Sequence, residues 1–407
     1  MEPTGLKVLR QRPRHTAAAA LVPDAKPSAS GIESLYIHIP FCFHKCHYCD
    51  FYSLVDTRDR QDTFTDRLIE ELGTLAPHAG KLRTIFVGGG TPTLLRHDLW
   101  KRLLETLNGS YDCSLLSEFT VECNPETASP KLFDTLRAGG VSRLSMGAQS
   151  FNLEHLRTLE RHHDPESVAR AATHARAAGI DRLSIDLIFG IPGQTLTEHA
   201  DDLDRALDLG TEHLSCYALT YEPGTAMTSR LSRGEFEPAS EEIEAQMLLQ
   251  TRDTLARAGL NRYEVSNFAR PGAECAHNLA YWRQDDWLAA GPSASGHARG
   301  ARWKNVPRLD DYIAQPGYAP VIDFEPPDPA RNLSEKIMTG LRLREGIDAD
   351  AILASAERLG CAPDLADEAR RAKEQGLLED AGGRWRPTDS GFLVADRLAS
   401  GFMARIP

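Results

Sequence analysis

The feature that most constrains this sequence is a repeated alternation of short apolar runs and helix-like stretches between residues 35 and 218. The apolar runs are rich in β-branched residues and are typical of buried strands, while the stretches between them carry apolar residues at helical spacing. Strands that alternate with helices in this way pair in parallel through right-handed crossovers. Six strands are predicted, over residues 35–39, 84–88, 119–123, 143–146, 183–188 and 213–218.

Six strand–helix units are fewer than the eight that close a full barrel. We therefore predict an α/β fold built on a partial (β/α)6 barrel that covers residues 34–225. In sheets of this kind the functional side chains gather at the C-terminal ends of the parallel strands. That edge of the sheet is where we expect the functional site.

The rest of the chain divides where its composition changes. Residues 1–33 are rich in Ala, Pro and small polar residues without periodicity, which predicts a disordered N-terminal tail. Residues 226–325 contain a long amphipathic stretch followed by an aromatic-rich one, and we expect them to extend the barrel. The stretch EPPDP at 325–329 indicates a boundary, and residues 326–407 are expected to form a small, mostly helical C-terminal domain.

Charge, hydropathy and cysteine content exclude several classes of protein. The formal net charge of −12 argues against nucleic acid as a partner, because phosphate contacts need clustered Lys and Arg. No window approaches 18 uninterrupted apolar residues, so we predict no membrane span. The 8 cysteines are too sparse for a disulfide scaffold in a chain of 407 residues. Three of the eight fall within eight residues, at 42, 46 and 49, and this clustering indicates a metal site in a reducing compartment, so we expect a cytoplasmic protein.

Three cysteines follow the first predicted strand directly. Cys42, Cys46 and Cys49 have the spacing C-x3-C-x2-C. Three thiolates on one loop can hold three irons of a cubane cluster and leave the fourth iron open to another ligand. A zinc ion is the alternative, and it needs a fourth ligand that a neighbouring histidine could supply: His38, His44 or His47. The spacing favours the iron–sulfur cluster and leaves zinc as the alternative.

Polar residues end or interrupt the apolar runs at successive strands. Glu122 lies at the end of the third predicted strand, Gln149 follows the fourth and Asp186 lies within the fifth. A buried carboxylate without a partner is costly, so each is either paired within the protein or bound to a ligand. A glycine turn, 88–90, follows the second strand and would let backbone groups approach that ligand closely. The recurrence at strand ends favours a ligand site.

The cysteine loop and the sequence GGGTP at 88–92 together resemble the radical S-adenosylmethionine (SAM) superfamily. YIHIP at 36–40, RLSMGAQSF at 143–151 and GIPGQT at 190–195 resemble its coproporphyrinogen III dehydrogenase-like group, and the similarity covers about residues 34–405. The resemblance implies a radical-SAM barrel, a winged-helix-like C-terminal domain, a [4Fe–4S] cluster on the three cysteines and SAM at the open iron. The SAM-binding residues that it implies are Tyr36, Tyr48, Gly89, Gly90, Thr91, Glu122, Gln149, Arg161 and Asp186.

Proteins with two different functions occur in that group, and their sequences differ. The dehydrogenase carries a fourth cysteine two residues after the third, where this chain has Phe51, and a longer arm before its cysteine loop. Haem chaperones of the HemW type instead carry the motif H-N-x-x-Y-W, which is similar to HNLAYW at 277–282. The resemblance therefore favours the chaperone, with His277, Tyr281 and Trp282 as the haem-binding residues. Imidazole is also the commonest proximal haem ligand.

We accordingly expect a haem chaperone that binds a [4Fe–4S] cluster, SAM and haem and passes haem to an acceptor haemoprotein. A reductant would serve the cluster, and a homodimer is compatible with the sequence. The first alternative is an enzyme, the oxygen-independent coproporphyrinogen III dehydrogenase. In that enzyme a 5′-deoxyadenosyl radical, formed when the reduced cluster cleaves SAM, drives oxidative decarboxylation of propionates. The second alternative is a zinc-binding interaction module.

Overall fold

The computed structural model describes residues 15–21 and 31–407, and its centre is a nine-stranded sheet in the order β10-β2-β3-β4-β5-β6-β7-β9-β8. The strands from β2 to β7 all run parallel. Each contains its predicted range, so the predicted partial (β/α)6 barrel is confirmed. Their bounds are β2 Ile32–Ile39, β3 Ala79–Gly89, β4 Glu118–Cys123, β5 Arg143–Gln149, β6 Arg182–Phe189 and β7 His213–Ala218.

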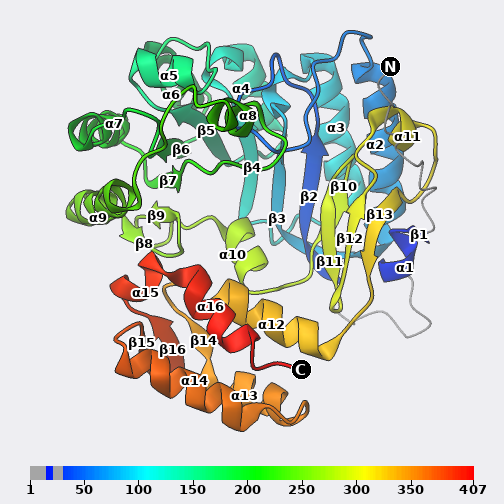
Figure 1. The fold of residues 1–407 in the computed structure, drawn as a ribbon. Helices are drawn as coiled ribbons and strands as arrows, with labels where there is room; N and C mark the ends of the chain where they lie inside the picture. Colours follow the sequence, from blue (N-terminus) through cyan, green and yellow to red (C-terminus); the bar gives the residue numbers. More distant parts are fainter. Residues whose placement is uncertain (1–14, 22–30) are drawn as a thin grey trace, which may run out of the picture.

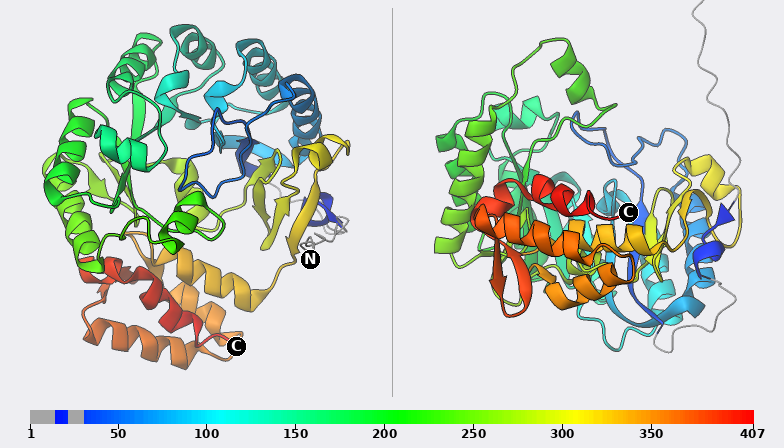
Figure 2. Two further views of the ribbon diagram at one scale, coloured as in Figure 1. Left: turned by 45° about the horizontal axis from the view of Figure 1, so that its top comes forward. Right: turned by 60° about the horizontal axis from the view of Figure 1, so that its bottom comes forward.

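Helices join these strands and form an arc outside them (Figure 2, left). They are α2 Gln61–Leu75, α3 His97–Ser110, α4 Pro130–Ala138, α5 Leu153–Thr158, α6 Glu166–Ala177 and α7 Leu196–Asp208, with short 3-10 helices at Ala76–His78, Pro92–Leu94 and Pro125–Thr127. Local sequence fixes where several begin. Ser129 caps α4, and Thr195 and Glu198 form a reciprocal capping box at the start of α7.

Side chains along the strands alternate between an apolar outer layer and a polar barrel interior. On β4, Phe119 and Val121 join the hydrophobic core shared with the helices, whereas Thr120 and Glu122 alternate with them. Successive side chains of a strand point to opposite faces of the sheet, so the second set faces the interior. Ser145 of β5 lies beside Glu122 in register and continues the polar layer. The barrel therefore encloses groups that need polar partners.

The sheet extends beyond the parallel strands at both edges. β10 (Leu288–Ala290) adds to β2 in parallel, and β9 (Asn267–Ala269) pairs antiparallel with β7 and with β8 (Asn261–Arg262). The connections hold α8 Ala226–Ser232, α9 Glu241–Arg257 and α10 Ala276–Trp282. A four-stranded sheet lies beside β10 and consists of β1 His15–Thr16, β13 Pro320–Glu325, β12 Ala301–Asn305 and β11 Ser295–Ala298, with α11 Leu309–Ile313.

The N-terminal stretch differs in part from the expectation of disorder over residues 1–33. β1 pairs with β13, and the short helix α1 (Ala18–Leu21) follows it. Ala17, Ala20 and Leu21 are buried, because the small alanine side chains allow close packing. β2 already begins at Ile32. The rest of the predicted tail, residues 1–14 and 22–30, lies outside the described residues.

The C-terminal part forms a separate helical unit with its own hydrophobic core. It consists of α12 Pro329–Gly340, α13 Ala349–Glu357, α14 Ala362–Glu374, α15 Asp389–Leu393 and α16 Ala395–Met403 around a small sheet of β14 Ile347–Asp348, β16 Arg384–Pro387 and β15 Leu378–Ala381. In Figure 1 it lies below β8, β9 and α10, at the end of the barrel away from the C-terminal ends of the parallel strands. In the part of the chain that the structure describes, no helix combines the length and hydropathy that crossing a bilayer requires.

Candidate functional site

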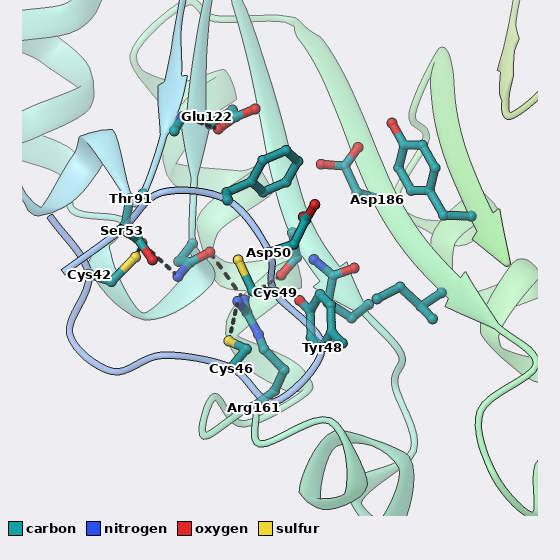
Figure 3. A pocket seen from close by; sticks show the side chains of 18 of the residues that line it. Cys42, Cys46, Tyr48, Cys49, Asp50, Ser53, Thr91, Glu122, Arg161 and Asp186 are labelled. Atoms are coloured by element: carbon teal, nitrogen blue, oxygen red, sulfur yellow. Dashed lines mark hydrogen bonds between the residues drawn. The ribbon is translucent and has the colours of Figure 1, made fainter. Parts of the chain in front are cut away.

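A cavity of about 380 Å³ opens at the C-terminal ends of the parallel strands, where the strand pattern predicts the site. It is lined by the loop after β2 and by residues at the ends of β3 to β7 (Figure 3). The predicted residues that line it are Cys42, Cys46, Tyr48, Cys49, Gly89, Gly90, Thr91, Glu122, Gln149, Arg161 and Asp186. Tyr36 does not line the cavity. Its ring stacks on Phe86 and its hydroxyl lies 3.1 Å from Nδ1 of His38.

The cysteine loop is fixed at its root by the backbone. The amide of Cys42 donates to the carbonyl of Leu54 (3.0 Å), and the amide of Leu54 donates to the carbonyl of Pro40 (2.8 Å). The three thiols are free and half-buried. Burial raises the pKa of Cys42, and burial together with the neighbouring thiols raises the pKa of Cys49 to about 11. Metal binding would therefore have to displace thiol protons.

Polar side chains lie close to two of the three cysteine sulfurs, those of Cys42 and Cys46. Sγ of Cys46 lies 3.8 Å from a terminal nitrogen of Arg161 and 3.6 Å from Nε2 of His44. Sγ of Cys42 lies 3.6 Å from Oγ1 of Thr91. Within residues 15–21 and 31–407, no three His, Cys, Asp or Glu side chains converge in a way that would hold one metal ion. The loop thus presents its sulfurs separately around the cavity.

The glycine turn after β3 packs tightly against this loop and against β4. A Cβ on Gly88 would lie 2.8 Å from Oε2 of Glu122. Gly89 has φ +114°, and its Cβ would lie 2.6 Å from the ring of His38. The amide of Gly90 donates to the carbonyl of Ile39 over 2.8 Å. Only residues without side chains allow this approach, which sets the position of the cysteine loop relative to the strand ends.

Two carboxylates face the cavity from β4 and β6, the strands on either side of β5. Glu122 accepts a hydrogen bond from the amide of Gly89 (3.0 Å). Asp186 accepts from the hydroxyls of Ser145 (3.2 Å) and Ser184 (3.3 Å). Burial, with the charge of Asp186, raises the pKa of Glu122 to about 7, and burial raises the pKa of Asp186. The cavity therefore holds negative charge that a cationic or hydroxyl-bearing ligand would stabilise.

Arg161 connects the cysteine loop to the ends of β4 and β5. It is buried, and one terminal nitrogen donates to the carbonyl of Gly147 (2.7 Å) and to Oδ1 of Asn124 (3.2 Å). Its Nε has no hydrogen-bond partner among the described residues. Gln149, at the end of β5, has φ +67°, which is uncommon for a residue with a side chain, and the β5–β6 register shifts there. Irregular backbone of this kind is typical of ligand sites.

Sequence reasoning missed some cavity residues. Asn124 follows β4 directly, and its amide donates to Oγ1 of Thr91 (3.1 Å). Ser145 could have been found, because strand alternation places it on the same face as Arg143 and beside Glu122. Ser53 lines the cavity with a buried hydroxyl that has no hydrogen-bond partner in the part of the chain that the structure describes, and nothing in its irregular loop predicts this.

The residues of the predicted haem motif lie away from this cavity, on α10. His277 is fully buried, and its Nδ1 lies 2.7 Å from Oγ1 of Thr84 while its Nε2 lies 2.8 Å from the hydroxyl of Tyr281. Burial lowers the pKa of His277 to about 4, so the ring is neutral. Glu118, the first residue of β4, accepts from the amide of His277 (3.2 Å). Trp282 is half-buried. His277 and Tyr281 thus hold α10 inside the barrel near the N-terminal end of β4.

Two family profiles match the chain. The profile of the Radical SAM superfamily matches residues 36–206, from β2 into α7. The profile of the HemN C-terminal domain matches residues 328–394, which include α12 to α15. The two matches correspond to the barrel and to the C-terminal helical unit.

Curated relatives are similar over nearly the whole chain. "Heme chaperone HemW" of Mycobacterium tuberculosis (strain H37Rv) is 36% identical over 385 residues, covering 93% of this chain and 96% of that protein. The protein of the same name from Bacillus subtilis (strain 168) is 33% identical over 383 residues, covering 92% and 100%. Among solved structures, coproporphyrinogen III oxidase (HemN) from Escherichia coli, described as a radical SAM enzyme, superposes with a TM-score of 0.78 at 25% identity, covering 92% of this chain and 90% of that one.

Proposed function

This chain belongs to the HemW family within the radical SAM superfamily, and from that premise we propose that it binds a [4Fe–4S] cluster, SAM and haem and transfers haem to an acceptor haemoprotein. The observation that carries the proposal is the cavity itself. It brings the three cysteines together with polar residues from the ends of five successive strands. A reductant for the cluster and a cytoplasmic setting belong to the same proposal.

The cysteine loop fits a [4Fe–4S] cluster better than a zinc ion. A cubane takes one thiolate on each of three irons, so its ligands stand apart around the cluster. A structural zinc ion needs four donors that converge on one point, and no three such donors converge among the described residues. Separate presentation of Cys42, Cys46 and Cys49 therefore supports the cluster over the zinc-binding module.

The groups beside the cysteines fit SAM, which carries a cationic sulfonium, an amino group and ribose hydroxyls. Glu122 and Asp186 offer carboxylates to such groups, and the glycine turn leaves backbone groups of 89–91 beside them. Nε of Arg161 is buried and has no hydrogen-bond partner in residues 15–21 and 31–407, so it can donate to a ligand. When bound, the cluster and SAM supply one-electron chemistry. The chain's own residues orient the ligand and exclude water from the strand ends.

We assign haem binding to α10 and its surroundings, with His277, Tyr281 and Trp282 as the proposed contacts. Both ring nitrogens of His277 already have partners in Thr84 and Tyr281. Ligation of haem iron by His277 would require these hydrogen bonds to break and α10 to move from the barrel base. A test of His277 must therefore separate loss of an iron ligand from loss of this anchor.

Position 51 is where the dehydrogenase alternative would need its fourth cysteine. Phe51 lines the cavity, and 66% of its surface is exposed to solvent. A phenyl ring there cannot ligate iron or transfer a hydrogen atom as a thiol can. This supports the chaperone over the decarboxylating enzyme.

The cofactor part of the proposal is tested by anaerobic reconstitution with iron and sulfide. The wild-type protein should turn brown and bind about four irons per chain. Cys49→Ser should lose most of this iron, whereas Cys113→Ser, which removes a half-buried thiol away from the cavity, should retain it. A colourless protein that binds one zinc per chain through the same cysteines would contradict the proposal.

A further inference from the structure

Asn124 joins Arg161 to Thr91 and so connects the surroundings of two cysteine sulfurs. One terminal nitrogen of Arg161 donates to Oδ1 of Asn124 (3.2 Å), and Nδ2 of Asn124 donates to Oγ1 of Thr91 (3.1 Å). The other terminal nitrogen of Arg161 lies 3.8 Å from Sγ of Cys46, and Oγ1 of Thr91 lies 3.6 Å from Sγ of Cys42 (Figure 3). We call Arg161, Asn124 and Thr91 the sulfur-donor network.

The chemistry of the partners determines the direction of each hydrogen bond. A guanidinium group only donates, so the side-chain oxygen of Asn124 must face Arg161. The amide nitrogen of Asn124 then faces Thr91, and it also donates to Oε1 of Glu126 (3.3 Å). Because Oγ1 of Thr91 accepts from Asn124, its own proton is left for Cys42. As a metal ligand Cys42 is a thiolate, and its sulfur can then only accept.

Cys46 receives its hydrogen bond from Arg161 rather than from the neighbouring histidine. Nε2 of His44 lies 3.6 Å from Sγ of Cys46 but only 2.7 Å from the carbonyl oxygen of Glu160. A carbonyl only accepts, so Nε2 of His44 carries a proton and directs it to the nearer Glu160. Arg161 is buried, and its terminal nitrogen beside Cys46 has no other hydrogen-bond partner among the described residues.

The backbone holds Asn124 in position directly after β4. The amide of Thr127 donates to the carbonyl of Asn124 over 3.0 Å, and the hydroxyl of Thr127 donates to the same carbonyl over 2.8 Å. Asn124 is half-buried and lines the cysteine cavity. Its side chain is therefore placed to orient Arg161 and Thr91 before any ligand binds.

Donors directed at ligating sulfurs affect the redox properties of an iron–sulfur centre. Hydrogen bonds to the sulfurs are among the factors that set its reduction potential. One electron from an external reductant adds negative charge to such a cluster, and hydrogen-bond donors stabilise negative charge on their acceptors. Loss of the donors to Cys42 and Cys46 should therefore favour the oxidised form.

We propose that Asn124 is a positioning residue that orients Arg161 and Thr91 to donate to the sulfurs of Cys46 and Cys42 and thereby raises the reduction potential of the cluster. The inference rests on the cluster binding proposed above. It assigns different nitrogens of Arg161 to different tasks, because Nε has no partner among the described residues and stays available to SAM.

The test is a redox titration of the reconstituted full-length protein with dithionite and mediators, followed by the electron paramagnetic resonance signal of the reduced cluster. SAM is left out, because Arg161 and Thr91 are also proposed to bind it. Asn124→Ala should shift the reduction equilibrium about tenfold toward the oxidised form, which is about 59 mV for one electron. Asn108→Ala, at an exposed position of α3, is the matched control and should keep the wild-type potential.

Thr91→Val tests the step from Asn124 to Cys42 separately. It removes the hydroxyl and keeps the shape of the side chain, and it should lower the potential by a similar amount. In the Thr91→Val background, Asn124→Ala should shift the potential less than it does in the wild type, because the path to Cys42 is already lost. Shifts that add in full would show that Asn124 does not act through Thr91 and would overturn the proposal.

Iron analysis and thermal unfolding separate failure of this inference from failure of the proposed function. Each variant should keep the wild-type iron content, because all three cysteines are retained. A wild-type potential in iron-loaded Asn124→Ala, or in Thr91→Val if Asn124→Ala does not fold, overturns the network while cluster binding stands. If the wild-type protein takes up no cluster, the proposed function fails and this inference fails with it.

Discussion

Among individual residues, Glu122 shows how burial in the barrel interior changes the protonation of a carboxyl group. Burial and the nearby Asp186 raise its pKa from 4.5 to about 7. Between these pH values the folded protein without cofactors binds more protons at this site than the unfolded chain does. The contribution of Glu122 to the free energy of unfolding therefore falls as pH rises from about 4.5 to about 7, by at most about 3 kcal/mol.

Glu122→Gln removes this dependence. We expect the stability of the variant relative to the wild type to increase between pH 4.5 and pH 7, as measured by urea denaturation across that range. Other buried groups, such as Glu264 with its own raised pKa, titrate in both proteins and cancel in the comparison. A difference between the two proteins that stays constant with pH would show that the carboxyl group titrates normally.

The same carboxylates are expected to determine SAM affinity. Asp186→Asn and Glu122→Gln should each weaken SAM binding to the reconstituted protein about tenfold, because each removes a charged acceptor. Equilibrium dialysis with labelled SAM measures this. Asp181→Asn is a matched control, because Asp181 is exposed just before β6. Unchanged SAM affinity in both variants would show that Glu122 and Asp186 do not contribute to SAM binding.

At the scale of elements, the turn after β3 sets how close the cysteine loop lies to the strand ends. Gly89→Ala places a Cβ against the ring of His38 at φ +114°. We expect it to lower the free energy of unfolding by about 2 kcal/mol and to reduce iron content after reconstitution.

Gly109→Ala is the control for this change, because its Cβ would meet nothing within 4 Å. In a helix that substitution should be neutral or slightly stabilising. Calorimetry together with iron analysis checks both variants. Equal stability of Gly89→Ala and the wild type would mean that the turn relaxes easily.

α10 is the element in which structural and binding roles must be separated. His277→Ala removes two buried hydrogen bonds and leaves a cavity beside Phe86, so we expect a loss of about 2–4 kcal/mol in stability. Denaturant unfolding measures it, with Asn278→Ala on the same helix as control. Wild-type stability in His277→Ala would argue against the anchoring role.

The long periodic elements could be predicted from the sequence, and the short ones could not. Each of the strands β2 to β7 contains its predicted range, because each holds a short apolar run bounded by stretches with helical spacing. β8 has two residues and β10 three, too few to carry a pattern. Their pairing depends on tertiary contacts such as those of β10 with β2.

The same limit applies to the sites. Cys42, Glu122 and Asp186 could be placed together because strand ends of a parallel sheet meet at one edge. The position of α10 could not be predicted, because the chain between the end of α9 at Arg257 and the start of α10 holds only the short strands β8 and β9.

At the scale of the whole molecule, the barrel separates the cysteine cavity from α10, the helix that we propose to bind haem. The cysteine cavity lies at the C-terminal ends of the parallel strands, whereas α10 lies toward the other end of the barrel, above the C-terminal unit in Figure 1. No residue of the haem motif lines the cysteine cavity, and sites without shared residues or partners are usually independent. Cys49→Ser, which should lose the cluster, is therefore expected to bind haem within about twofold of the wild type in a Soret titration. A much larger loss would show that the cluster organises the haem site.

The measurement that tests the central claim most directly compares two incubations of the anaerobically reconstituted protein. One contains haem, and the other contains coproporphyrinogen III with SAM and a reductant. The account predicts a stoichiometric Soret band in the first and no protoporphyrinogen in the second. Formation of protoporphyrinogen with consumption of SAM would contradict it and assign the chain to the decarboxylating enzymes despite Phe51.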